Sequence, residues 1–212
     1  MTIQSPYIPK WEIEEAKQLV AELGVAFEIL EVPIIDEIRN SPENRCYLCK
    51  KAVFSQIKAI AQREGYPYVI DGTNLDDIGD YRPGLKALKE LNIKSSLLEC
   101  QLSKQEIRSL SKELGLNTWD KPPYACLLTR IPYGNELQKE DFVKIEEVEK
   151  YIIGRGFRAV RVRCHDNLAR IEVDKNDKIK LFNEELLEEI SHNGSLGYAI
   201  RNSYRLPNSF LR

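Results

Sequence analysis

Apolar side chains recur along this chain with two different periods, and each period predicts one kind of element. Apolar positions three or four residues apart predict helices at 9–23, 46–64, 85–91 and 142–153. Ser103 and Glu106 form a capping box that opens a further helix, which runs to Gly115. Short apolar runs at 25–32, 68–71 and 96–99 predict strands. Strands that alternate with helices indicate βαβ units and a parallel sheet.

The pattern of apolar and polar residues changes after residue 118. Residues 157–163 and 169–173 alternate apolar and polar side chains, which predicts two strands joined as a hairpin through 164–168. A helix at 179–190 and a last strand at 197–200 follow. This order predicts a small α+β, ferredoxin-like module. The chain is therefore expected to be an α/β protein with two domains, 1–117 and 118–212.

Composition excludes several classes of protein. The 212 residues are 42% apolar and 30% charged, with a net charge of -2, which is typical of a soluble globular protein and gives no general attraction to nucleic acid or anionic membranes. Neither an apolar run of the roughly 20 residues that span a bilayer nor a basic-then-apolar leader is present, so we expect a cytoplasmic protein. An odd number of cysteines, five, favours reduced thiols.

The segment 119–134 places Cys126 between a proline pair and Arg130. Prolines fix φ and remove backbone donors, so this loop is expected to be stiff and irregular. A thiol near a guanidinium is a candidate reactive site, because nearby positive charge favours the thiolate. The alternative is a buried structural cysteine at a domain junction, since free cysteine is among the most buried residue types.

Polar residues follow the predicted strand at 68–71, where ligands bind in open parallel sheets. Thr73 and Asn74 offer hydrogen-bonding groups, and Asp76 and Asp77 offer oxygen ligands suited to Mg²⁺. Arg82 precedes a helix start, where it can bind a phosphate. A turn with capping aspartates and a surface arginine is the alternative interpretation.

A charged face is expected on the predicted hairpin. Arg161 and Arg163 alternate with apolar residues and so lie on one face, as do Arg170 and Glu172 on the neighbouring strand. Three arginines and a glutamate suit a ligand that carries phosphate and carboxylate groups. A solvated sheet face with ion pairs is the alternative.

The remaining cysteines allow two further hypotheses. Cys46 and Cys49 form a CxxC that lacks the two further ligands of a structural zinc site, so we interpret them as packing residues of a helix start, with Arg45 the better functional candidate. Cys100, Cys126 and Cys164 lie at or near the ends of predicted elements, and three thiolates can hold a [4Fe–4S] cluster with one open site. His165 is interpreted as a turn residue.

Five segments taken together carry a resemblance to a known family. They are RCYLCKKAVF (45–54), DGTNLDDIGDYRPG (71–84), LSKQEIRSLSKELGL (102–116), TWDKPPYACLLTRIPYG (118–134) and RAVRVRCHDNLARIEV (158–173). In this order the chain resembles the ATP-dependent sacrificial sulfur transferases, LarE, of the PP-loop ATP pyrophosphatases. The resemblance implies a Rossmann-like nucleotide domain and a smaller C-terminal domain for substrate binding and oligomerisation, in a homo-oligomer.

The resemblance also implies a reaction. ATP, with Mg²⁺, adenylylates a carboxylate of a pyridinium mononucleotide on the route to the nickel-pincer nucleotide, and Cys126 displaces AMP. Cleavage of the Cβ–S bond of that cysteine leaves a thiocarboxylate and dehydroalanine; some members use a three-cysteine cluster instead. Covalent catalysis splits one difficult step into two. By the same match, the substrate would contact Arg130, Arg161, Arg163 and Glu172, and the nucleotide would contact Thr73, Asn74, Asp76 and Arg82.

One departure from the family pattern affects the functional prediction. That pattern begins with a strand and an SGGxDS phosphate loop, neither of which is found in this sequence. We therefore expect a fragment, a partner polypeptide that supplies the loop, or loss of adenylylation. The alternatives to a sulfur transferase are a pseudoenzyme or partner subunit that binds a nucleotide-like ligand, and an iron–sulfur carrier.

Overall fold

The computed structural model describes residues 1–165, 168–183, 188–190 and 199–202. Within them the chain is a mixed α/β protein with one parallel pair of strands and one three-stranded sheet. Two compact units are distinguished, and each is described by itself. The first unit comprises Met1–Pro42 with the described residues from Pro122 onward, and the second unit comprises Glu43–Lys121.

The N-terminal part of the first unit is a strand–helix–strand motif. Strand β1 (Thr2–Gln4) pairs in parallel with β2 (Ile29–Glu31), and helix α1 (Lys10–Leu23) connects them. The helix ends at Gly24, whose φ of 62° is left-handed and suits glycine. A 3₁₀ turn, η1 (Asp36–Ile38), follows. The helix and its terminating glycine are as the sequence predicts, and the strand is shorter than the predicted 25–32.

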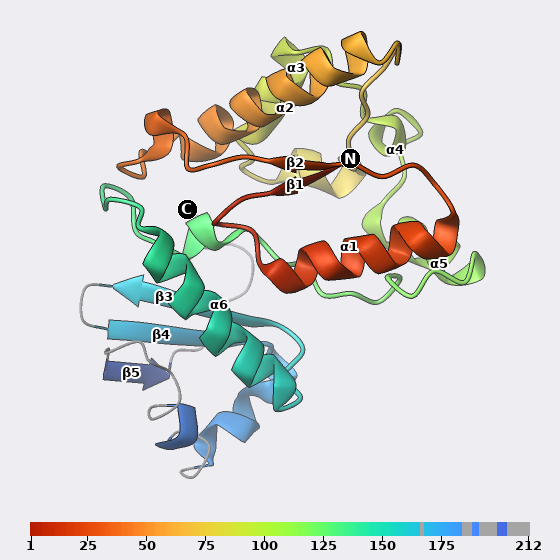
Figure 1. The fold of residues 1–212 in the computed structure, drawn as a ribbon. Coiled ribbons are helices and arrows are strands. Elements are labelled where there is room, and N and C mark those ends of the chain that lie inside the picture. The colour runs from red at the N-terminus through yellow and green to blue at the C-terminus, as the bar shows by residue number, and fades with distance from the viewer. Residues whose placement is uncertain (166–167, 184–187, 191–198, 203–212) are drawn as a thin grey trace. The chain divides into compact units, whose positions relative to one another are not determined.

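The rest of the first unit packs a helix on a sheet, as Figure 1 shows. Helix α6 (Lys139–Gly154) buries Phe142, Ile145, Val148 and Ile152, and strand β3 (Val160–His165) buries Val160 and Val162. Strand β4 (Leu168–Val173) pairs antiparallel with β3, and β5 (Ala199–Asn202) pairs in parallel with β4. The 3₁₀ segment η4 (Lys175–Phe182) lies between β4 and β5 in the chain. The predicted antiparallel pair of strands is confirmed, but its connection is shorter than the predicted 164–168. Cys164 and His165 belong to β3 and Leu168 to β4, so the interpretation of His165 as a turn residue is wrong, and 166–167 lie outside the described residues.

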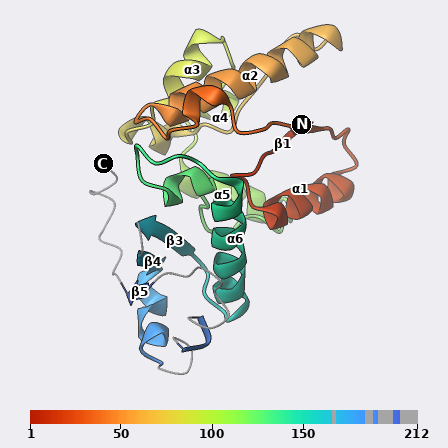
Figure 2. The same cartoon turned by 60° about the vertical axis from the view of Figure 1, so that its left-hand side comes forward.

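The second unit is mainly helical. Helix α2 (Arg45–Arg63) packs against α3 (Gly84–Glu90), and both views show the two side by side (Figure 2). A Cβ on Gly84 would lie 2.9 Å from Lys50 Cδ, so the absence of a side chain there permits the close approach. The unit also contains η2 (Leu75–Gly79), α4 (Ser96–Glu99) and α5 (Lys104–Glu113).

The predicted strand at 96–99 is wrong, because these residues form the single helical turn α4. The Ser95 carbonyl accepts a hydrogen bond from the Glu99 amide at 2.9 Å, which closes the turn. The predicted strand at 68–71 is reduced to one parallel bridge between Ile70 and Lys94. Of the predicted helix at 179–190, residues 188–190 are helical and 179–182 belong to η4, while 184–187 lie outside the described residues.

The compact units divide the chain differently from the expected domains 1–117 and 118–212. One boundary, between Lys121 and Pro122, lies near the expected one, but the first 42 residues group with the C-terminal part. Rossmann-like and ferredoxin-like topologies remain predictions. None of the described helices has the length and apolar character needed to cross a membrane.

Candidate functional site

Cys126 begins a tight turn, and hydrogen bonds fix the backbone at Cys126 and at the next residue, Leu127. It precedes the 3₁₀ turn η3 (Leu127–Arg130), and its carbonyl accepts hydrogen bonds from the Thr129 amide at 3.2 Å and the Thr129 hydroxyl at 3.1 Å. The next amide, that of Leu127, donates to the Tyr7 carbonyl at 2.8 Å. Cys126 is partly exposed. The loop therefore has a fixed backbone and a thiol-bearing residue within reach of solvent.

Arg130 ends the same turn in a buried ion pair. Its Nε and Nη2 donate to the two carboxylate oxygens of Glu149 at 2.7 and 3.0 Å, and both side chains are almost fully buried. Glu149 also accepts the Val162 amide at 2.8 Å, so one carboxylate joins α6, η3 and β3. The Arg130 guanidinium is thus committed to the protein, and its expected contact with substrate stays a prediction.

The predicted arginine face is present on β3 and β4. Arg161 pairs in register with Glu172, and Arg163 with Arg170. Glu172 Oε1 accepts from Arg163 Nε at 2.8 Å and lies 3.0 Å from Arg170 Nη2. Arg163 also donates from Nη1 to the Thr129 carbonyl at 2.7 Å. The structure therefore connects the arginine face to the turn that begins at Cys126.

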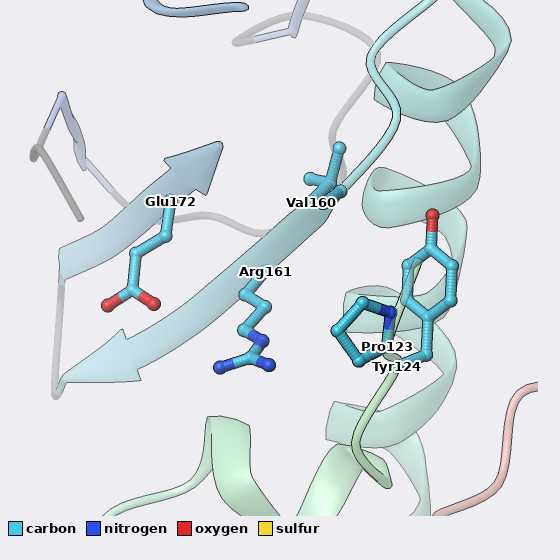
Figure 3. A pocket seen from close by; sticks show the side chains of 6 residues that line it. Pro123, Tyr124, Val160, Arg161 and Glu172 are labelled. Atoms are coloured by element: carbon cyan, nitrogen blue, oxygen red, sulfur yellow. The ribbon is translucent and has the colours of Figure 1, made fainter. Parts of the chain in front are cut away.

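A small hollow, too narrow to admit a water molecule, is lined in part by this face (Figure 3). Its lining residues come from the Cys126 loop and from the region of β3 and β4; they are Pro123, Tyr124, Ala159, Val160, Arg161 and Glu172. The Tyr124 hydroxyl donates to the Arg158 carbonyl at 2.6 Å, and its ring packs edge-on with Trp11 at 4.8 Å between centroids. Burial, together with the charge of Glu149, raises the pKa of Tyr124 to about 12, so its phenol is neutral near pH 7.

In the polar loop of the second unit, the polar side chains form hydrogen bonds and an ion pair with nearby residues. Thr73 donates to Asp71 at 2.6 Å, and Asn74 forms a capping box with Asp77 at the start of η2. Asp76 accepts the amide of Lys104, the first residue of α5, at 2.5 Å. Arg82 pairs with Asp77 at 2.8 Å. These contacts are those of the capping-turn interpretation, and nucleotide binding by Thr73, Asn74, Asp76 and Arg82 stays a prediction.

The cysteines do not form a visible metal group. Among the described residues, no three His, Cys, Asp or Glu side chains gather as a metal ion would require. Cys100 is exposed in the second unit, whereas Cys164 is buried in β3, where desolvation raises the pKa of its thiol to about 11. The cluster of Cys100, Cys126 and Cys164 remains an untested hypothesis.

Sequence reasoning missed two residues that organise the site. Thr129 contacts Cys126, Arg130 and Arg163, yet threonine in a loop carries no distinctive signal. Glu149 did leave a signal in the sequence, because this glutamate follows Val148 within the apolar stripe of α6. In the structure its side chain is only 1% exposed. A charged residue in a buried stripe predicts a paired partner.

Comparison with known proteins gives three relatives, while no model of a protein family matches the chain. An uncharacterised protein of Synechocystis sp. is 42% identical over 82% of this chain and 65% of its own length. An uncharacterised protein of Methanocaldococcus jannaschii is 38% identical over 89% of this chain and 71% of its own length. The pyridinium-3,5-bisthiocarboxylic acid mononucleotide synthase of Lactiplantibacillus plantarum is 37% identical over 76% of this chain. This chain spans 59% of that synthase and less than two thirds of the Synechocystis protein.

Proposed function

The chain belongs to one family with the Methanocaldococcus jannaschii protein, and the named synthase is a more distant homologue. On this premise we propose that it takes part in sulfur transfer to a pyridinium mononucleotide on the route to the nickel-pincer nucleotide. The supporting observation is the hydrogen-bonded connection from the turn at Cys126 to the arginine face through Thr129. It joins a partly exposed thiol-bearing residue to groups that suit phosphate and carboxylate.

The proposed reaction has two chemical steps on this chain. The Cys126 thiolate attacks the carbonyl carbon of an acyl adenylate, a C–S bond forms, and AMP departs with the electron pair of the broken C–O bond. Loss of the Cα proton of Cys126 then breaks its Cβ–S bond, with the electron pair on sulfur. The products are a thiocarboxylate and dehydroalanine. Adenylylation makes the first step accessible because carboxylate oxygen is a poor leaving group and AMP a good one.

The arginine face would hold the anionic groups of the substrate. Arg161 lines the hollow, and Arg170 keeps its side chain 38% exposed beside Glu172. Guanidinium groups bind phosphate and carboxylate with two parallel hydrogen bonds, which fixes orientation as well as charge. Arg130 would act differently: bound to Glu149, it would position the turn that follows Cys126 rather than touch the substrate.

In this proposal the second unit would bind ATP and Mg²⁺. Asp76 and Asp77 supply the hard carboxylate oxygens that Mg²⁺ prefers, although Asp77 already accepts the Asn74 amide within the loop and Asp76 accepts the Lys104 amide of α5. A segment of another polypeptide that supplies a phosphate-binding loop is part of the same proposal, as is a homo-oligomer. The acyl adenylate can also be supplied ready-made, and this separates the thiol chemistry from ATP binding.

Intact mass spectrometry tests the proposal in two arms. The first arm incubates the protein with ATP, Mg²⁺ and a dicarboxylated pyridinium mononucleotide; the second supplies the synthetic acyl adenylate of that nucleotide. We expect a loss of about 34 Da, the mass of H₂S, located at Cys126 by peptide mapping. Cys126→Ala should abolish the loss, and the matched variant Cys100→Ser, at an exposed cysteine of the second unit, should retain it.

The two arms separate the possible failures. Loss of mass only with the acyl adenylate would retain the thiol chemistry and reject ATP activation by this chain alone. An unchanged mass in both arms would reject sulfur transfer from Cys126.

A binding protein without adenylylation is the second candidate. Its supporting observation is the loop at 71–82, where Thr73, Asn74 and Arg82 are all engaged in local bonds. Such a protein would bind the mononucleotide through the arginine face and release no pyrophosphate from ATP. Calorimetric binding of the mononucleotide to wild type and to Arg161→Met, with pyrophosphate measured in parallel, distinguishes the two candidates.

A further inference from the structure

Thr129 is the residue where the thiol-bearing turn and the arginine face meet. Its hydroxyl donates to the Cys126 carbonyl at 3.1 Å and accepts from Arg130 Nη1 at 2.7 Å. Its own carbonyl accepts from Arg163 Nη1 at 2.7 Å. One side chain and one carbonyl therefore hold the backbone of Cys126, the buried Arg130 and a member of the arginine face in a single arrangement.

Each partner of Thr129 is fixed at its other end. Arg130 is held by Glu149, which is 1% exposed, and Arg163 is held by Glu172 at 2.8 Å. The Cys126 turn is also tied to the Tyr7 carbonyl through the Leu127 amide. Because these anchors lie on α6, β4 and the N-terminal segment, a movement of the turn must break contacts with several elements.

We propose that Thr129 is a positioning residue that fixes Cys126 relative to the arginine face, so that an anion bound there is presented to the thiol. This inference rests on the proposed function in taking Cys126 as the reacting residue. Thr129 itself touches no reacting atom in the proposal. Its part is to keep the thiol-bearing turn and the anion-binding guanidinium groups in one geometry, which reduces the entropy lost on reaching a productive arrangement.

Two alkylating reagents measure this geometry without ATP or substrate. Iodoacetate carries a carboxylate that the arginine face should attract, whereas iodoacetamide is neutral. The ratio of their rates at one thiol cancels changes in exposure and in thiol pKa, which affect both reagents alike. We expect the ratio at Cys126 to exceed the ratio at exposed Cys100 by about threefold or more, as electrostatic steering permits. Peptide mapping by mass spectrometry gives both rates in one sample.

Two variants of Thr129 isolate its hydroxyl. Thr129→Val keeps the branched shape without the hydroxyl, and it should lower the ratio at Cys126 to that at Cys100. Thr129→Ser restores the hydroxyl and should restore most of the ratio. A folded Thr129→Val protein with the wild-type ratio would overturn the inference, as would an equal loss in both variants.

A measurement on the wild-type protein covers the case in which Thr129→Val fails to fold. Inorganic phosphate at constant ionic strength should slow iodoacetate at Cys126 and leave Cys100 unaffected; equal rates with and without phosphate would overturn the inference. The outcomes also separate this inference from sulfur transfer. A ratio that depends on Thr129 in a protein that never forms dehydroalanine would support the positioning role and reject the proposed function.

Discussion

Arg130 and Glu149 form a two-pronged ion pair, with contacts of 2.7 and 3.0 Å between side chains that are 0% and 1% exposed. Glu149 satisfies a further donor, the Val162 amide, at 2.8 Å. Removal of one partner would leave the other charge buried, and this penalty exceeds the net contribution of the intact pair. The pair therefore joins the turn that follows Cys126 to α6.

Substitution of either partner should be strongly destabilising. Glu149→Gln leaves the Arg130 charge without its counter-ion and should lower the free energy of unfolding by about 3 kcal/mol. Urea denaturation followed by circular dichroism measures this change. Lys17→Gln, which breaks the exposed pair with Glu14, is the matched control and should leave the midpoint unchanged. Equal midpoints for the two variants would contradict the prediction.

Cys164 should make stability depend on pH in the alkaline range. Burial raises the pKa of its thiol from the ordinary 9.0 to about 11, so the unfolded chain loses this proton at lower pH than the folded chain. The resulting stability is fully present below pH 9 and is lost as pH rises toward 11. Denaturation midpoints across this window should fall less steeply in Cys164→Ala than in wild type. Parallel curves would show that another group causes the loss.

The capping box of α5 should act in the acid range. Hydrogen bonds from the Ser103 hydroxyl and amide lower the pKa of Glu106 below its ordinary 4.5. The stability from this carboxylate is therefore present above pH 4.5 and is lost as pH falls through the lowered value. Ser103→Ala should cost about 1 kcal/mol at pH 7, and stability should vary less between pH 5 and 3 than in wild type. Thermal unfolding at several pH values measures both effects, and an unchanged acid slope would contradict the assignment.

Arg108 should restrain the segment that leads into the Cys126 loop. Its guanidinium donates to the Trp119 carbonyl at 3.2 Å and to the Lys121 carbonyl at 2.6 Å, and Lys112 lies 4.5 Å from the centre of the Trp119 ring. Arg108→Ala should therefore speed cleavage by chymotrypsin after Trp119 severalfold, because local opening exposes the bond. Arg63→Ala, at an exposed arginine of α2, is the control. Equal cleavage rates in the two variants would argue against a restraint by Arg108.

Periodicity predicted the elements in which one stripe of side chains is buried. Helix α6 and strand β3 follow their patterns because Ile145, Ile152, Val160 and Val162 all enter one core. The run Leu97–Leu98 gave no such guide, since two adjacent leucines fit a short strand and a helical turn equally. The hydrogen bond of Ser95 to Asp71 at 2.6 Å, absent from any periodic pattern, accompanies the turn that forms there.

The sequence predicted the part of the site in which charged residues alternate with apolar ones along a strand. It did not predict the part that depends on contacts between residues distant in sequence. Arg161 and Arg163 lie on one face because strand geometry requires it. Burial of Arg130 depends on Glu149, which is distant in sequence, so the chain alone did not distinguish a substrate contact from a buried pair. The role of Thr129 depends on three partners from two elements.

The grouping of Met1–Pro42 with the residues after Pro122 has a consequence for synthesis on the ribosome. The described part of the second unit, Glu43–Lys121, is one continuous segment, so it can acquire its structure as soon as it leaves the exit tunnel. The first unit completes its fold later. The backbone hydrogen bonds from Leu127 to Tyr7 and from Gly134 to Ser41 join segments that are translated far apart in time. Its early segment therefore spends that interval without its later partner, and this is the stage at which a chaperone would encounter it.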